Sequence, residues 1–322
     1  MISSRREFLK RTGKTGLAVF ATGGLGYWFH TRDQFPEPPD TAPKFYDYRI
    51  SLPSGAPDLS VIRGPDVEKI TLSAIESCGG IDHFISRGDR VVLKPNVSWD
   101  RVPEQAANTN PLVVKTVVSL CKKAGAKEII VTDVSCNDPR RCFRRSGIAQ
   151  AAQEAGATVI LPEARKFKRI NMGGKMLGQW QIFLPLIEAD KVINLPILKQ
   201  HYLCRLTMGM KNWYGIIGGI RAQLHQNIHE SIVDLAQFIK PSLIILDATH
   251  VMVTNGPSGG SLRDVRKMDT VIAGVDQVSV DTYGAQLFGL DPKDVQFLRL
   301  AHERGLGTMD LKALTIYQNS IG

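Results

Sequence analysis

Three lysines in this chain stand beside side chains that hydrogen-bond readily. Lys94 follows apolar residues 91–93 and precedes Asn96, Lys199 lies just before a histidine, and Lys211 precedes Asn212. A lysine ammonium group neutralises a phosphate or carboxylate as a point charge, and an asparagine offers a donor and an acceptor that orient it. The alternative is that these lysines are solvated. We predict that Lys94, Asn96, Lys199, Lys211 and Asn212 bind an anionic small molecule or a cofactor, whose identity these residues leave unknown.

Two histidines and one aspartate are candidates for proton transfer beside those lysines. Asp247 directly follows apolar residues 243–246, and His201 lies two positions after Lys199. A carboxylate or an imidazole next to a bound anion can act as a general acid or base. We therefore predict catalytic roles for His201, His229 and Asp247. For Asp247 the alternative is an ion pair with a nearby lysine.

His225 and His229 are four residues apart, the spacing that places two imidazoles on one helix face for a metal ion. However, Asn227 and Glu230 have the spacing of a capping box, which would begin a helix at Asn227 and leave His225 outside it. The same histidines could instead hydrogen-bond a ligand singly. A metal-dependent protein that uses His225 and His229 is therefore one of the alternatives that the sequence leaves open.

Short apolar runs alternate with amphipathic segments along residues 58–322. The runs typical of buried strands are 59–63, 90–93, 128–131, 158–161, 192–195, 243–246 and 271–273. The segments with helical spacing of apolar residues are 67–78, 111–124 and 144–155. Repetition of strand, helix and strand predicts an α/β fold with a mostly parallel sheet and helices on both faces.

Residues 166–185 depart from this pattern, because glycines separate two short alternating runs, and we expect a small β-hairpin insertion there.

In an open α/β sheet, ligands bind in a crevice beyond the carboxyl ends of the strands. Lys94, Asp247 and the segment around Lys199 each follow a predicted strand. We therefore expect the candidate site residues to converge on one crevice.

The first thirty residues resemble a twin-arginine (Tat) export signal. Arg5 and Arg6 precede Phe8, Leu9 and a weakly apolar stretch over residues 15–29. That stretch is shorter than the roughly 20 residues that span a bilayer as a helix. We predict a periplasmic protein whose residues 1–30 engage the Tat translocon through Arg5 and Arg6. Whether the segment is removed or stays as a membrane tether is left open.

Residues 31–57 hold six prolines, which predicts an extended linker, so a single α/β domain is expected over 58–322.

The net charge of the 322 residues is +9, but the first thirty hold five basic residues and one acid and so contribute four of those charges. The chain is therefore not expected to bind nucleic acid. Five cysteines without a C-x-x-C pair argue against ferredoxin-type clusters and zinc ribbons. A disulfide between Cys136 and Cys142 is left open.

Taken together, several short motifs resemble the bacterial and archaeal family known as domain of unknown function 362, over roughly residues 60–290. These motifs are Lys94-Pro95-Asn96, Thr109-Asn110-Pro111, Asn194-Leu195-Pro196 with Lys199 and His201, Lys211-Asn212-x-Tyr214-Gly215, the His225 and His229 region, Asp247-Ala248 and Asn255-Gly256-Pro257. Some members of that family carry iron-sulfur modules, so the resemblance implies a link to redox metabolism. This chain lacks the cysteine runs of those modules, and the family implies no particular reaction.

The sequence as a whole predicts an exported protein that binds an anionic small molecule or cofactor and is a candidate redox-linked enzyme. Two alternatives stay open beside it. One is a non-catalytic ligand-binding or cofactor-assembly protein that uses the same crevice, and the other is the metal-dependent protein described above. A base within about 3.2 Å of the reacting proton would separate an enzyme from a binding protein.

Overall fold

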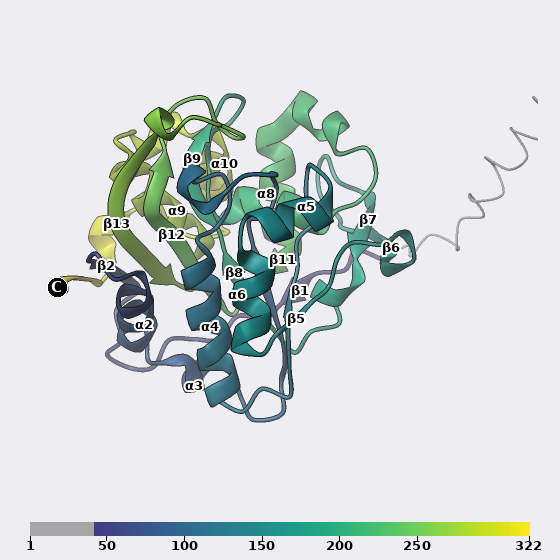
Figure 1. The fold of residues 1–322 in the computed structure, drawn as a ribbon. Helices are drawn as coiled ribbons and strands as arrows, with labels where there is room; N and C mark the ends of the chain where they lie inside the picture. The colour runs from purple at the N-terminus through teal and green to yellow at the C-terminus, as the bar shows by residue number, and fades with distance from the viewer. Residues whose placement is uncertain (1–41) are drawn as a thin grey trace, which may run out of the picture. The chain divides into compact units, whose positions relative to one another are not determined.

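The computed structural model describes residues 42–322 (Figure 1). The predicted export signal over residues 1–30 and the first part of the predicted linker lie outside the described residues.

One large mixed sheet forms the centre of the domain, and five of the seven pairings along its main path are parallel. In sheet order its strands are β14 (Ile316–Ser320), β2 (Leu59–Arg63), β13 (Val265–Gly274), β12 (Leu243–Met252), β8 (Lys191–Leu195), β3 (Arg90–Pro95), β4 (Glu128–Val131) and β5 (Thr158–Val159). Strand β13 is antiparallel to both of its neighbours. The predicted mostly parallel α/β fold is confirmed.

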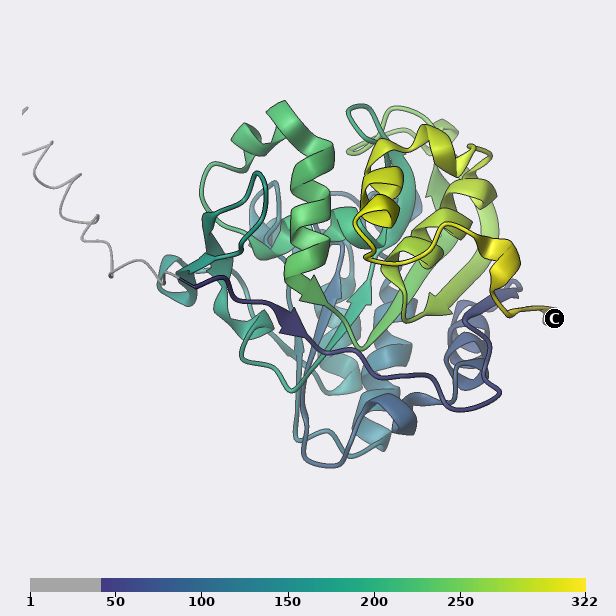
Figure 2. The ribbon, with the colours of Figure 1, turned by 180° about the vertical axis from the view of Figure 1, so that it is seen from behind.

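Helices cover both faces of this sheet, as predicted. On the face seen in Figure 1 lie α2 (Val67–Ser77), α4 (Pro111–Lys123) and α6 (Ile148–Ala155). On the opposite face, seen in Figure 2, lie α8 (Ile228–Phe238) in green, and α9 (Gln277–Phe288) and α10 (Gln296–Glu303) in yellow-green to yellow. Because both faces are covered, neighbouring residues of one strand enter different cores. Val91 belongs to the core on the side of α2, α4 and α6, and Val92 belongs to the core on the side of α8, α9 and α10. This explains why the central strands are continuous apolar runs rather than alternating ones.

Short elements at the ends of the sheet complete the fold. They are β1 (Tyr46–Asp47), α3 (Ile81–Phe84), α5 (Pro139–Arg145), β6 (Phe167–Asn171), β7 (Gln179–Phe183), β9 (Ile197–His201), β10 (Arg205–Thr207), α7 (Gly209–Asn212) and β11 (Ile239–Lys240). Strands β6 and β7 pair antiparallel, so the predicted β-hairpin insertion is confirmed. Strand β9 pairs with β12 on one side and with β10 on the other, which carries the chain from the sheet toward α7.

Two predicted segments are arranged differently in the structure. The helix expected over 144–155 is broken between α5 and α6, because Gly147 adopts a left-handed backbone conformation with φ of 73°. Residues 42–57, expected to belong to a linker, lie against the domain: β1 pairs with β11, and the Tyr48 hydroxyl donates a hydrogen bond to the Leu186 carbonyl. The folded domain therefore begins before the expected start at residue 58. Within the described part of the chain, no helix combines the length and apolar character that crossing a bilayer requires.

Candidate functional site

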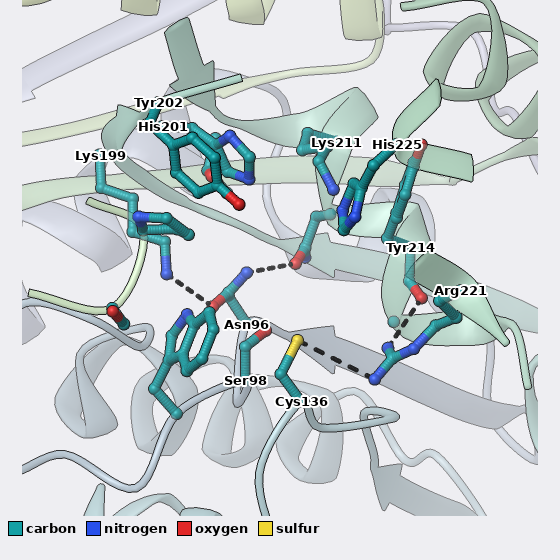
Figure 3. A pocket seen from close by; sticks show the side chains of 16 residues that line it. Asn96, Ser98, Cys136, Lys199, His201, Tyr202, Lys211, Tyr214, Arg221 and His225 are labelled. Carbon is teal, nitrogen blue, oxygen red and sulfur yellow. Dashed lines mark hydrogen bonds between the residues drawn. The ribbon is translucent and has the colours of Figure 1, made fainter. Parts of the chain in front are cut away.

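A cavity of about 340 Å³ opens beyond the carboxyl ends of β3 and β4, beside β9 and α7 (Figure 3). We call this cavity the strand-end pocket. It lies where the topology of an α/β sheet predicts a ligand crevice. Five of the eight predicted site residues line it: Asn96, Lys199, His201, Lys211 and Asn212.

Lys94, the sixth predicted site residue, lies beneath the strand-end pocket rather than at its surface. Its ammonium group forms an ion pair with Asp133 at 2.6 Å, and the two side chains are 1% and 0% exposed. Burial lowers the pKa of the Lys94 ammonium group, and the adjacent Asp133 carboxylate counteracts that effect. Lys94 therefore has its counter-ion within the protein and supports the pocket from below.

Asn212 connects Lys94 to the pocket. Its Oδ1 accepts hydrogen bonds from Lys94 Nζ at 2.9 Å and from Asn96 Nδ2 at 3.1 Å. Its Nδ2 donates to the Lys94 carbonyl at 3.0 Å and to Asn194 Oδ1 at 2.8 Å. Since both ends of the amide are occupied, Asn212 holds its neighbours in place rather than offering free groups to a ligand.

Lys199 lines the pocket from strand β9, and its residue surface is only 1% exposed. Its Nζ donates to the Ala107 carbonyl at 2.5 Å and to Asn96 Oδ1 at 3.3 Å. Burial lowers the pKa of Lys199 to about 7; the negative charge of Asp133 opposes this effect, and the positive charges of Lys211 and Lys94 add to it. Near neutral pH a large fraction of this amine is therefore uncharged.

Lys211 enters the pocket from the short helix α7 and is 8% exposed. Its Nζ lies 3.2 Å from the centroid of the Tyr214 ring, a cation–π contact. Burial lowers the pKa of Lys211 to about 8. Asp281 sets the start of α7, because its carboxylate accepts hydrogen bonds from the backbone N–H groups of Gly209 at 2.6 Å and Met210 at 2.9 Å.

Arg221 is a third cation in the pocket, and sequence analysis missed it. Its guanidinium group donates to three backbone carbonyls, those of Val134 at 2.6 Å, Tyr214 at 3.2 Å and Ser135 at 2.5 Å. Carbonyl acceptors fix the group without neutralising its charge. Nothing in the spacing around Arg221 indicated this role, because two of its three partners, Val134 and Ser135, lie more than eighty residues away in the chain.

His201 lines the pocket as a hydrogen-bond donor. Its Nδ1 accepts from the backbone N–H of Leu203 at 3.2 Å, which places the ring proton on Nε2. Burial, followed by the charges of Lys211 and Lys199, lowers the pKa of His201 to about 3, so the ring is neutral at physiological pH. The basic nitrogen is occupied, and the proton-transfer role of His201 stays a prediction.

The structure does not bring His229 and Asp247 to the pocket. The His229 ring stacks on Phe297, with centroids 6.4 Å apart. The buried Asp247 carboxylate accepts from the backbone N–H of Asn110 at 2.8 Å and from the N–H and hydroxyl of Thr249 at 2.9 and 2.7 Å. Asp247 therefore joins strand β12 to the start of helix α4. Neither Asp247 nor His229 lines the pocket beside which their proton-transfer roles are predicted.

The histidines of the metal alternative lie in different surroundings. His225 lines the pocket and stacks on Tyr214, with centroids 6.2 Å apart, whereas His229 lies in α8. Asn227 precedes α8, but its side chain makes no capping hydrogen bond. Across residues 42–322, no group of three or more histidine, cysteine, aspartate and glutamate side chains is arranged to hold a metal ion.

All five cysteines are free, so Cys136 and Cys142 are not joined in the structure. Cys142 is buried, whereas Cys136 is exposed and lines the pocket. The Cys136 sulfur accepts a weak hydrogen bond from the Arg221 guanidinium group at 3.9 Å. The sequence did not single out this cysteine as a pocket residue.

The fold and the pocket together define an α/β protein with a cation-lined cavity at the ends of its parallel strands. The chain belongs to the family described as domain of unknown function (DUF362), whose model matches residues 91–286. It is 28% identical over 263 residues to the thylakoid-associated protein sll1697 of Synechocystis sp.. The alignment covers 77% of this chain and 79% of that protein.

Two solved structures are similar at a lower level. The lactate racemase apoprotein from Thermoanaerobacterium thermosaccharolyticum aligns with 76% of this chain, with 13% identity and a TM-score of 0.40. A protein from Thermotoga maritima aligns with 75% of it, with 11% identity and a TM-score of 0.40. The chain spans 61% and 60% of the lengths of these two structures.

Proposed function

We propose that the strand-end pocket binds a small organic anion. The observation that carries this proposal is a charge imbalance: the cations Lys211 and Arg221 line one cavity together with the basic amine of Lys199, and no aspartate or glutamate lines it among residues 42–322. Buried charges are normally paired, because desolvating an isolated ion is costly. A phosphate or carboxylate group of a ligand would supply the missing negative charge.

The remaining walls of the pocket favour a ligand with an apolar part. Trp99, Tyr202 and Tyr214 line the cavity beside the cations, and its volume falls at the lower end of the roughly 300–1,000 Å³ of small-molecule sites. His201 adds a neutral N–H donor. These features favour ligand binding over the metal-dependent alternative, which lacks a set of ligands among the described residues.

Isothermal titration calorimetry with inorganic phosphate and with pyruvate tests this proposal. We expect both anions to bind, and Lys211→Met to weaken binding by about tenfold to a hundredfold, the range for loss of a charged hydrogen bond. Lys123→Met is the matched control, because Lys123 is an exposed lysine of α4, away from the pocket. The proposal would be contradicted if neither anion bound the parent protein, or if Lys211→Met bound the anions with the same affinity as the parent protein.

We also propose that residues 1–30 direct export to the periplasm through the Tat translocon. The support is the pair Arg5 and Arg6 ahead of the apolar stretch. The Synechocystis relative is named a thylakoid-associated protein, and we take that name as support for a tethered form. Fractionation of cells that express the parent chain or Arg5→Lys/Arg6→Lys tests export. An unchanged periplasmic fraction in the double variant would exclude this route.

A further inference from the structure

Lys199 differs from the other two lysines of the site in how its amine is held. Lys94 has Asp133 as a counter-ion, and Lys211 lies over the Tyr214 ring, a contact that favours the charged form. The Lys199 amine instead has two neutral acceptors, the Ala107 carbonyl and Asn96 Oδ1. A neutral amine has two N–H bonds, and these acceptors match both of them.

This arrangement leaves the nitrogen lone pair free. Figure 3 shows the Lys199 side chain reaching from β9 toward Asn96 within the ring of lining residues. The orientation of Asn96 is set in turn, because its Nδ2 donates to the oxygen of Asn212 that also accepts from Lys94. The Lys94 charge thus orders a chain of hydrogen bonds that ends with an oxygen facing the Lys199 amine.

A lysine amine becomes nucleophilic when it is desolvated and stands next to another cation, because both effects favour the uncharged form. Lys199 meets both conditions, with its burial and its pKa of about 7. A carbonyl compound that reacted with Lys199 would also need an anionic group to pair with the neighbouring cations Lys211 and Arg221. A small oxo acid carries both groups in one molecule.

We propose that Lys199 forms an imine with the carbonyl carbon of a small oxo acid whose carboxylate is bound by Lys211. This inference rests on the proposed anion-binding function and names the substrate class of that pocket. In the step, the amine nitrogen attacks the carbonyl carbon, a C=N bond replaces the C=O bond, and the carbonyl oxygen leaves as water together with the two hydrogens of the neutral amine. No oxidant or reductant takes part in this step, and imine formation is reversible.

Reductive trapping tests the inference on the purified chain. The protein is incubated with pyruvate, glyoxylate or acetoacetate and sodium cyanoborohydride, which reduces an imine to a stable secondary amine, and the modified lysine is mapped by peptide mass spectrometry. We expect a single adduct at Lys199, and loss of that adduct in Lys199→Arg, which keeps a positive charge but has no amine nucleophile. Lys123→Met is expected to be modified as the parent is.

The outcomes of these experiments distinguish failure of imine formation at Lys199 from failure of the proposed anion binding. Adducts spread over exposed lysines, or an adduct that persists on another pocket lysine in Lys199→Arg, would overturn the role of Lys199. No adduct with any of the three oxo acids, while calorimetry still detects pyruvate binding, would overturn imine formation and leave anion binding intact. Absence of both would overturn both. A thermal melt that matches the parent shows that Lys199→Arg is folded.

Discussion

The ammonium group of Lys94 lies 2.6 Å from the carboxylate of Asp133, directly beneath the strand-end pocket, and both side chains are shielded from solvent. The two residues come from the ends of neighbouring parallel strands, Lys94 within β3 and Asp133 two residues after β4. Asp133 also accepts a hydrogen bond from the Val97 backbone N–H at 2.7 Å. This pair therefore joins the two strand ends on which the pocket is built.

Removal of the Asp133 charge is expected to destabilise the protein strongly. Asp133→Asn would leave the Lys94 charge buried without a counter-ion, which typically costs about 3–5 kcal/mol. Chemical denaturation followed by circular dichroism measures the change in the free energy of unfolding. Glu68→Gln is the control, because the Glu68–Lys115 ion pair is about half exposed and is expected to contribute less than about 1 kcal/mol. Equal effects of the two substitutions would contradict a structural role for the buried pair.

Gly215 is expected to tolerate no side chain. A Cβ atom built there would collide with the Asp133 carboxylate oxygen and with Lys94 Nζ, neither of which can retreat without breaking the ion pair. We expect Gly215→Ala to cost about 1–3 kcal/mol, the range for overpacking a filled site, and to weaken phosphate binding. The control is Gly178→Ala, since no atom lies within 4 Å of a Cβ at Gly178. A neutral Gly215→Ala in the same denaturation experiment would show that the pair has room to move.

Anion binding is expected to weaken as the pH rises above about 8. Lys211 has a pKa of about 8 in the free pocket, and a bound anion favours its charged form, so binding raises that pKa and takes up a proton. The affinity for phosphate should fall by up to about tenfold per pH unit between about pH 8 and about pH 10. Calorimetry in two buffers with different ionisation enthalpies measures the proton uptake. Lys211→Arg, which stays charged over this range, should show a smaller pH dependence.

Cys136 is expected to be the most reactive thiol of the folded chain. It is exposed at the pocket, whereas the other four cysteines are buried. We expect a thiol reagent such as Ellman's reagent to modify one cysteine of the native protein, and all five after denaturation. Cys136→Ser should abolish the native reaction, and phosphate should slow it in the parent protein. Reaction of a buried cysteine at the same rate would contradict the accessibility described here.

Much of the fold could be predicted from the sequence because the strands are short, continuous apolar runs. The run predicted at 59–63 has the bounds of β2, and the predicted strand at 128–131 those of β4. The alternating pattern of 166–185 predicted the β6–β7 hairpin equally well. Local backbone conformation was harder to predict: Gly147 breaks a segment whose apolar spacing was that of a single helix. The export signal lies outside the described residues and stays a prediction.

The candidate site could be predicted in part, for a related reason. Lysines and asparagines that follow strands must gather at one edge of a parallel sheet, and Asn96, Lys199 and Lys211 do so. Which way each side chain points depends on its partners across the fold. Asp247 turns toward Asn110 and Thr249, away from the pocket, and Arg221 enters it through carbonyls that lie more than eighty residues away.

The sequence by itself determined the class of fold, the edge of the sheet at which polar residues gather and the chemistry of those residues, because strand periodicity and residue type are local properties. Only the tertiary structure decided which lysine has a counter-ion and which do not. Asp133 neutralises Lys94, whereas Lys199 and Lys211 face a cavity without acidic residues among residues 42–322. The physical reason is that pairing and burial depend on contacts between segments distant in the chain, which residue spacing does not encode.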